Sequence, residues 1–211
     1  TQVAALTTEQ VVALSTAQVQ VISSAGISAL STSQVAALET VDVAALKTSQ
    51  IVAIGTEGIA ALTTDQIASL TTAQIQVIST AGIAALRTDQ VAAIETVDLA
   101  VLTSRQIGAF TTAGIAALTT DQIGAVIGGF TTAAVAALST AQVAAMTTSQ
   151  IAIFNTAQIQ AITTAGIAAM TTDQVAAIVT TDVAVLKTTQ LVALTTAGVA
   201  ALTTDQIGAI T

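Results

Sequence analysis

The sequence predicts an all-α fold, a solenoid in which short helices from an eight-residue repeat wind into a superhelix. The first observation is the repeat: residues 7–118 divide into fourteen octads, residues 119–130 form a twelve-residue unit, and residues 131–210 divide into ten more octads. The second is that positions five and eight of each octad are large and apolar, and residues three apart share one face of a helix. The third is that octads begin with helix-capping residues.

The start of each octad has the pattern of a helix N-terminus. In the octad that begins at Thr63, the Thr63 hydroxyl can cap a helix, and Gln66 completes a capping box. Leu62 and Ile67 then stand at the two hydrophobic-staple positions. Position one is Ser, Thr or Asn in 18 of the 25 units, and position seven is usually Ala, the best helix former. These features favour one short helix per octad.

Positions two and four are constant for reasons that capping at position one does not explain. Position two is Thr in 23 units, so it either caps some helices or packs its methyl group while its hydroxyl bonds the previous turn. Position four is Gln in 15 units and Gly in 6. Because glycine weakens a helix, its recurrence predicts close backbone approach at this position. The glycines form two series: Gly26, Gly82, Gly166 and Gly58, Gly114, Gly198.

A longer period lies above the octad. The segment TAQIQVI begins at Thr72, and its relatives begin at Thr16 and Thr156, so the starting numbers differ by 56 and by 84. Both differences are multiples of 28, which predicts a superhelical turn of three and a half octads. On this hypothesis the four extra residues of the twelve-residue unit keep equivalent side chains on the same side. The alternative is duplication of a seven-octad block followed by an unrelated insertion.

A β-solenoid is the alternative fold, because Thr, Val and Ile favour strands. In either fold one octad is too small to persist alone, so neighbouring octads must bury each other's apolar residues. No stretch departs from the pattern, which predicts one continuous array over residues 1–211 with no linker or leader segment. The array begins and ends in mid-pattern, as expected of a piece of a longer chain.

The composition excludes most chemical functions. Without His or Cys the chain lacks an imidazole base, a thiolate and an ordinary zinc, haem or iron–sulfur site. A net charge of −8 with only 4 basic residues argues against nucleic acid as a partner. No apolar run approaches the roughly 18 residues of a membrane span. We therefore expect no enzyme activity, no cofactor, and no catalytic, cofactor-binding or metal-binding residues.

Three acidic residues are the candidates for a cation such as calcium. Asp42, Asp98 and Asp182 all stand at position four and recur with the long period. The sequence has no clustered D-x-D loop of the kind that calcium sites use. An acid in the first turn of a helix is stabilised by the helix dipole. The pattern therefore favours helix-start acids, with calcium as a weaker possibility.

The basic residues and the IGGF segment have structural interpretations. Lys47, Arg87 and Lys187 directly follow the apolar end of an octad, which suits a helix C-terminus. With Arg105 they are too few for a basic patch. The IGGF sequence at 127–130 predicts a local kink or a loop inside the insertion.

Two resemblances bear on function. The string LTTEQVVAL at 6–14 resembles the opening of TAL-effector repeats, but the match stops after nine residues, so it implies shared capping chemistry and not DNA recognition. The tandem TTxQIAAL octads of the whole chain resemble repeat regions of giant secreted bacterial surface proteins, often labelled adhesins or haem-utilisation-like exoproteins. The haem label does not extend to this chain, because its only Met residues, Met146 and Met170, occupy core position eight.

The second resemblance implies an extracellular or cell-surface structural protein. We expect a filament or adhesin stalk that associates with copies of itself, because so apolar a composition leaves apolar outer faces. The alternative function is a surface-binding or ice-binding module that uses regularly spaced Thr, and it requires a flat array of strands.

Overall fold

The computed structural model describes residues 2–210, which contain helices and no β-strand. The predicted all-α fold is thus confirmed, and the β-solenoid alternative is wrong. The α-helices are α1 Thr8–Val12, α2 Thr16–Val21, α3 Ser24–Ile27, α4 Thr32–Ala37, α5 Thr40–Ala45, α6 Thr48–Ala61, α7 Thr64–Ala68, α8 Thr72–Gln76, α9 Thr80–Ala84, α10 Thr88–Ala93, α11 Thr96–Leu99, α12 Ser104–Ile107, α13 Thr112–Ala117, α14 Thr120–Val126, α15 Thr132–Ala136, α16 Thr140–Ala145, α17 Thr148–Ile153, α18 Thr156–Ile159, α19 Thr164–Ala169, α20 Thr172–Ala177, α21 Thr180–Val183, α22 Thr188–Ala193, α23 Thr196–Ala201 and α24 Thr204–Ala209. Two short 3-10 helices are η1 Gln2–Ala5 and η2 Ile127–Gly129.

Most octads begin their helix with a residue whose side chain caps it. The Thr63 hydroxyl accepts a hydrogen bond from the Gln66 amide nitrogen at 3.1 Å, and Gln66 Oε1 accepts one from the Thr63 N–H at 2.8 Å. The staple residues Leu62 and Ile67 are 0% and 1% exposed. Position one is therefore the cap, and the constant Thr of position two, such as Thr64, is the first helical residue.

The α6 helix joins two octads across a kink. Gly55 stands at position one, where other octads have a capping residue in extended conformation, and it adopts φ 71° and ψ 179°. This region of backbone conformation is open essentially to glycine alone. The two octads therefore continue into one another without a side-chain cap between them.

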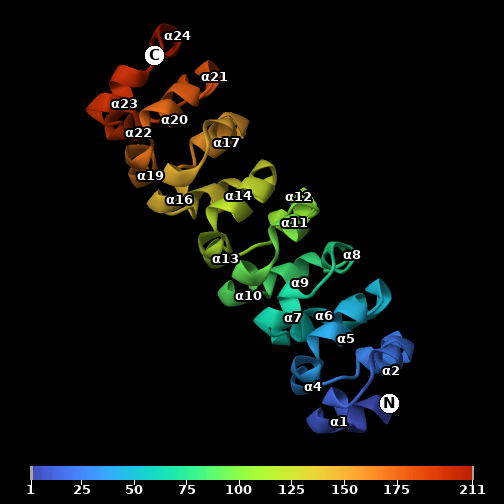
Figure 1. The fold of residues 1–211 in the computed structure, drawn as a ribbon. Helices are drawn as coiled ribbons and strands as arrows, with labels where there is room; N and C mark the ends of the chain where they lie inside the picture. Colours follow the sequence, from blue (N-terminus) through green and yellow to red (C-terminus); the bar gives the residue numbers. More distant parts are fainter. Residues whose placement is uncertain (1, 211) are drawn as a thin grey trace. The chain divides into compact units, whose positions relative to one another are not determined.

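The described residues form two compact units, one that ends at Ala117 and one that begins at Leu118. Within each unit a helix packs on the helix three octads further along the chain, as α1 does on α4 and α16 on α19. Figure 1 shows these successions of short helices in chain order. Positions five and eight of most octads point into the core. For example, Ile75 and Ile78 of one octad are 0% and 3% exposed, whereas Val199 and Ile207, at position five of the last two octads, are 47% and 49% exposed.

The predicted turn of three and a half octads is confirmed in both units. Side-chain hydrogen bonds link residues 28 apart, from Gln66 to the carbonyl oxygen of Leu38 in the first unit and from Gln174 to that of Met146 in the second. Because one turn contains three and a half octads, position four of one octad lies over position eight of an octad in the preceding turn.

The twelve-residue unit acts as two repeats, one complete and one of four residues. Its first eight residues are the N-cap Thr119 and the helix α14, and Ile127–Gly129 form η2. Ile127 and Phe130 are 2% and 4% exposed, so they fill positions five and eight of the short repeat. Gln142 bonds the carbonyl of Leu118, only 24 residues earlier. The prediction that four extra residues complete a regular turn is thus wrong here, because the segment replaces an octad. The IGGF segment expected to be a kink or loop is a 3-10 helical turn.

Candidate functional site: the glutamine ladder

The glutamine of position four makes two sets of hydrogen bonds. Gln74 Oε1 accepts from the N–H of Thr71 at 2.8 Å, which closes the capping box of α8. Gln74 Nε2 donates to the carbonyl oxygens of Val43 and Leu46, each at 2.8 Å, on the preceding turn of the superhelix. The side chain is buried, with 2% of the residue exposed. One amide group therefore caps its own helix and joins it to the previous turn.

This pairing recurs along both units, and we call it the glutamine ladder. Its acceptors are carbonyls of position eight, where a helix has ended and its last carbonyls lack intrahelical partners. The other pairs at the same spacing are Gln34 with Leu6, Gln50 with Ile22, Gln66 with Leu38, Gln90 with Leu62, Gln106 with Ile78, Gln158 with Phe130, Gln174 with Met146, Gln190 with Ile162, and Gln206 with Ile178, at 2.6–2.9 Å. The ladder thus satisfies buried groups that an isolated octad would leave unpaired.

Sequence reasoning found the capping half of this site and missed the ladder half. A capping box accepts Glu as readily as Gln at its third helical residue. Yet position four is never Glu in this chain, although Glu occurs at positions one and three. Only the amide also carries N–H donors. The absence of Glu is the signal that could have revealed the second role.

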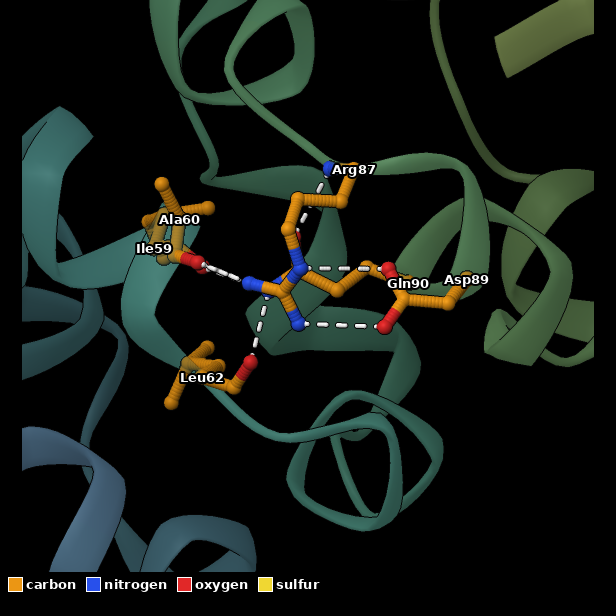
Figure 2. A network of polar contacts seen from close by, with 6 residues as sticks. All are labelled: Ile59, Ala60, Leu62, Arg87, Asp89 and Gln90. Atoms are coloured by element: carbon orange, nitrogen blue, oxygen red, sulfur yellow. Dashed lines mark hydrogen bonds and ion pairs between the residues drawn. The ribbon is translucent and has the colours of Figure 1, made fainter.

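The basic residue Arg87, at position one of its octad, adds a polar link between turns in the first unit (Figure 2). The Arg87 guanidinium donates to the carbonyl oxygen of Ala60, beside the bond of Gln90 Nε2 to Leu62 at 2.7 Å. Arg87 Nε also bonds Asp89 at 3.1 Å, and this hydrogen bond lowers the pKa of the exposed Asp89 carboxyl below its ordinary value. The network holds one carboxylate charged at the surface.

The helix C-terminus predicted for the basic residues needs a correction. Lys47, Arg87 and Lys187 stand at the N-terminal caps of α6, α10 and α22, and no side-chain cap is made there. Lys187 Nζ instead reaches back to the carbonyl oxygen of Gln160 at 2.9 Å, at the end of α18. The Lys187 ammonium group therefore lies at a helix C-terminus, but that helix belongs to the preceding turn of the superhelix. Arg105 is exposed in α12.

A second glutamine, at position six, accounts for the segment TAQIQVI and its relatives, which recur with the long period. Gln20 Nε2 donates to the carbonyl oxygen of Ala45 at 3.0 Å, and Gln76 Nε2 donates to that of Val101 at 3.4 Å. Gln160 makes the same bond to Val185 in the second unit. In each case the acceptor lies 25 residues later, in the octad that carries an aspartate at position four. The two markers of the long period therefore meet in space.

The aspartates of position four lie in the first turns of α5, α11 and α21, as predicted for helix-start acids. Asp42, Asp98 and Asp182 are buried, with 1%, 3% and 3% exposed. Burial raises the pKa of Asp98, with a further contribution from the charge of Glu95, and burial raises the pKa of Asp182. Within residues 2–210 no group of three or more acidic side chains gathers to hold a metal ion. The structure therefore gives the calcium interpretation no further support.

The glycines of position four face a side chain and not a neighbouring backbone. A Cβ on Gly58 would come within 2.3 Å of Ile54 Cγ2, and one on Gly82 within 2.8 Å of Ile78 Cγ2. The expectation of close backbone approach is therefore corrected. At Gly58 and Gly82 the near side chain is an Ile that closes the preceding octad, whereas Gly198, which follows a Leu, meets nothing closer than 3.3 Å.

Comparison with known proteins identifies the repeat. None of the helices in residues 2–210 has the length and apolar run that crossing a membrane requires. Neither a curated protein nor a solved structure matches the sequence. The model of the ALTTAQ repeat family matches six segments that cover most of the chain: residues 3–40, 35–72, 91–126, 127–154, 151–180 and 175–211. The chain therefore belongs to the ALTTAQ repeat family.

Proposed function

We propose that this repeat array is a stalk or filament segment of an extracellular or cell-surface protein. The observation that carries the proposal is the glutamine ladder, which joins each turn to the one before it by the same bonds. A solenoid built in this way grows in one dimension, because each repeat contacts only its neighbours along the coil. Repeat number then sets length, which is the property that a stalk or filament needs.

The surface and composition support the same role. Only 4 residues are Lys or Arg, so the chain offers few sites to trypsin-like proteases. Several aliphatic side chains stand in solvent on the outer positions of the octads, among them Val21 at 79% and Val192 at 80% exposed. Such exposure favours lateral association with a second copy. The proposal assigns the chain no catalysis and no cofactor.

The ice-binding alternative loses its structural basis. It requires a flat array of strands that presents Thr at regular spacing, and residues 2–210 contain no strand. The Thr residues of position two begin separate short helices instead, as Thr8 and Thr64 do.

Changing the number of repeats tests the stalk proposal. Duplicating the segment from Glu39 to Ile94 adds seven octads, and deleting it removes seven. We expect small-angle scattering and electron microscopy to show a constant cross-section and a length that rises and falls by the same step. A particle that widens with added repeats would contradict the proposal.

Two further measurements address association and location. Sedimentation at increasing protein concentration should show self-association that weakens when Val21 and Val192 become Ser, because exposed apolar area is lost. Antibody labelling of intact cells of the source organism should detect the array without permeabilisation. Labelling only after permeabilisation would exclude the extracellular part of the proposal and leave the structural part standing.

A further inference from the structure

Three octads replace the ladder glutamine with an acid. Asp42 in α5, Asp98 in α11 and Asp182 in α21 occupy position four, and each is no more than 3% exposed. An ionised carboxylate only accepts hydrogen bonds, whereas the glutamine amide also donates them. At these three places the ionised side chain cannot make the bond that joins one turn to the previous turn.

These carboxyls occupy the position from which a glutamine donates elsewhere in the coil. At the ladder spacing of 28 and 31 residues, seen for Gln50 with Ile22 and Val19, the corresponding acceptors for Asp42 are the carbonyl oxygens of Leu14 and Val11. Asp42 Oδ2 is buried and has no hydrogen-bond partner. Carbonyl oxygens carry partial negative charge, so an ionised carboxylate among them is both unpaired and repelled.

The charged groups around the three carboxyls do not relieve this. The Asp42 octad begins with Glu39, the packed helix α2 carries no charged residue, α7 carries Asp65, and α1, which supplies the facing carbonyl, carries Glu9. Asp98 has Glu95 at its own cap, and α8, packed against it, is uncharged. For Asp182 the packed helices are α18, which is uncharged, and α24, which carries Asp205. Lys187 begins the next octad, but its Nζ bonds Gln160.

We propose that Asp98 and Asp182, buried at the ladder position of α11 and α21, are acid-stabilised joints of the superhelix. When either carboxyl takes up a proton from solvent, it gains an O–H that donates to the carbonyls of the preceding turn, as glutamine does. When it is ionised, that link is lost and the joint loosens. The two joints recur at the long period, so the coil responds to pH at defined places while the glutamine bonds between them are kept.

The sign of the effect follows from the burial of the carboxyls. Burial raises the pKa of Asp98 and of Asp182 in the folded chain. A carboxyl of this kind contributes its stabilisation fully below its unfolded-state pKa and loses it as the pH rises through the higher folded-state pKa. The joints therefore tighten in mild acid and loosen toward neutral pH.

Replacing the two acids with the ladder residue tests the proposal. The variant Asp98→Gln, Asp182→Gln is compared with a control that changes the exposed acids Asp173 and Asp205, at position three, to Gln. Thermal unfolding is followed by circular dichroism at pH 4.5 and pH 7.5, and conversion at position four should remove the advantage of the acidic sample. It should also raise the melting temperature at pH 7.5 by about 2–4 °C or more. The control should keep the wild-type difference between the two pH values, and an equal pH dependence in all three proteins would overturn the proposal.

Carboxyl titration by NMR tests the unmodified chain. The side-chain carbons of Asp98 and Asp182 should titrate above the ordinary pH range of an aspartate. Hydrogen exchange of the amides in α11 and α21 should quicken as the pH rises, beyond the base-catalysed increase seen in α10 and α20. Titration of both buried acids at or below the ordinary aspartate value would refute the joints.

Discussion

A regular turn of the superhelix and the short turn in the second unit close with the same bond. In the regular turn Gln66 reaches the carbonyl of Leu38, 28 residues earlier, at 2.6 Å. In the short turn Gln142 reaches the carbonyl of Leu118, 24 residues earlier, at 2.7 Å. The difference teaches that the coil depends on the number of apolar pairs per turn and not on the number of residues. A repeat can lose its first four residues if it keeps positions five and eight.

The largest effect should come from the apolar pair that the short repeat keeps. Ile127→Ala and Ile123→Ala each remove a side chain no more than 2% exposed. Each should lower the free energy of unfolding by about 2–5 kcal/mol in denaturant titrations. Ile153→Ala, on a side chain 56% exposed, is the control and should change it by less than about 0.5 kcal/mol. A much smaller loss at Ile127 than at Ile123 would show that the short repeat is a loop and not a repeat.

The ladder bond should matter equally in both turns. Gln66→Leu and Gln142→Leu each leave buried carbonyl oxygens without a donor, so each should cost about 1–3 kcal/mol of unfolding free energy. Gln10→Leu serves as the control, because Gln10 is exposed and its hydrogen bonds to Thr7 lie within its own capping box. If the loss at Gln142 were close to that of the control, the closure of the short turn would not depend on this bond.

The sequence predicted the elements of a regular turn better than those of the short one. Capping chemistry at Thr63 and Gln66 and the apolar pair of positions five and eight are local patterns, so helix, cap and core could be derived from one octad. The length of the regular turn could also be derived, because residues such as Gly58 and Gly114 recur with the long period. The short repeat could not, since the four letters of IGGF do not show whether they extend one octad or replace another.

The ladder itself escaped prediction for a related reason. A capping box accounts for Gln66 completely at the level of one octad, and the second set of bonds joins residues far apart in the chain. The same limit applies to Asp98, whose position four predicts a helix-start acid. Only the packing of α8 against α11 shows that this acid is buried. Local chemistry is readable from the repeat, and chemistry between turns needs the stagger of the coil.

Substitution of glycine tests how tightly successive octads pack, and its expected effects are smaller. Gly58→Ala places a methyl group 2.3 Å from Ile54 Cγ2, so it should cost about 1–3 kcal/mol of unfolding free energy. Gly208→Ala meets nothing within 4 Å and lies in α24, so it should gain about 0.5–1 kcal/mol. Paired thermal melts of the two variants decide the matter, and a loss at both positions would mean that glycine is needed for the backbone and not for the Ile.

Restoring the four missing residues is the direct test of what the short turn lacks. Insertion of Thr-Thr-Ala-Gln before Ile127 converts IGGF into a complete octad and returns the closure between Leu118 and Gln142 to the spacing of a regular turn. The new N-cap should stabilise the fold, whereas ordering the four added residues costs conformational entropy. Because these two effects oppose one another, the unfolding free energy should change by less than about 1 kcal/mol. The same insertion between Gln74 and Ile75 adds no apolar pair and should lower it by more. Equal losses at both sites would contradict the counting of apolar pairs.

The surface contact of Arg87, a residue of position one that makes no side-chain cap, should matter least. Arg87→Met removes the links of the guanidinium to Ala60 and Asp89 but keeps an apolar stem, and the Arg87 and Asp89 side chains are 49% and 55% exposed. The Arg87 hydrogen bond holds the pKa of Asp89 below its ordinary value, so the substitution should raise the NMR titration midpoint of Asp89. Asp65, at the same position behind Thr63, is the internal reference, and its midpoint should not change.

The pKa shift of Asp89 is opposite in sign to that of Asp98, one position later in its octad, because burial raises the pKa of Asp98. A carboxyl whose folded-state pKa is lowered stabilises the fold above its unfolded-state pKa, and this stabilisation is lost as the pH falls. Acid should therefore weaken the contact of Arg87 with Asp89 while it strengthens the Asp98 joint. An unchanged Asp89 midpoint would show that the surface contact does not form in solution.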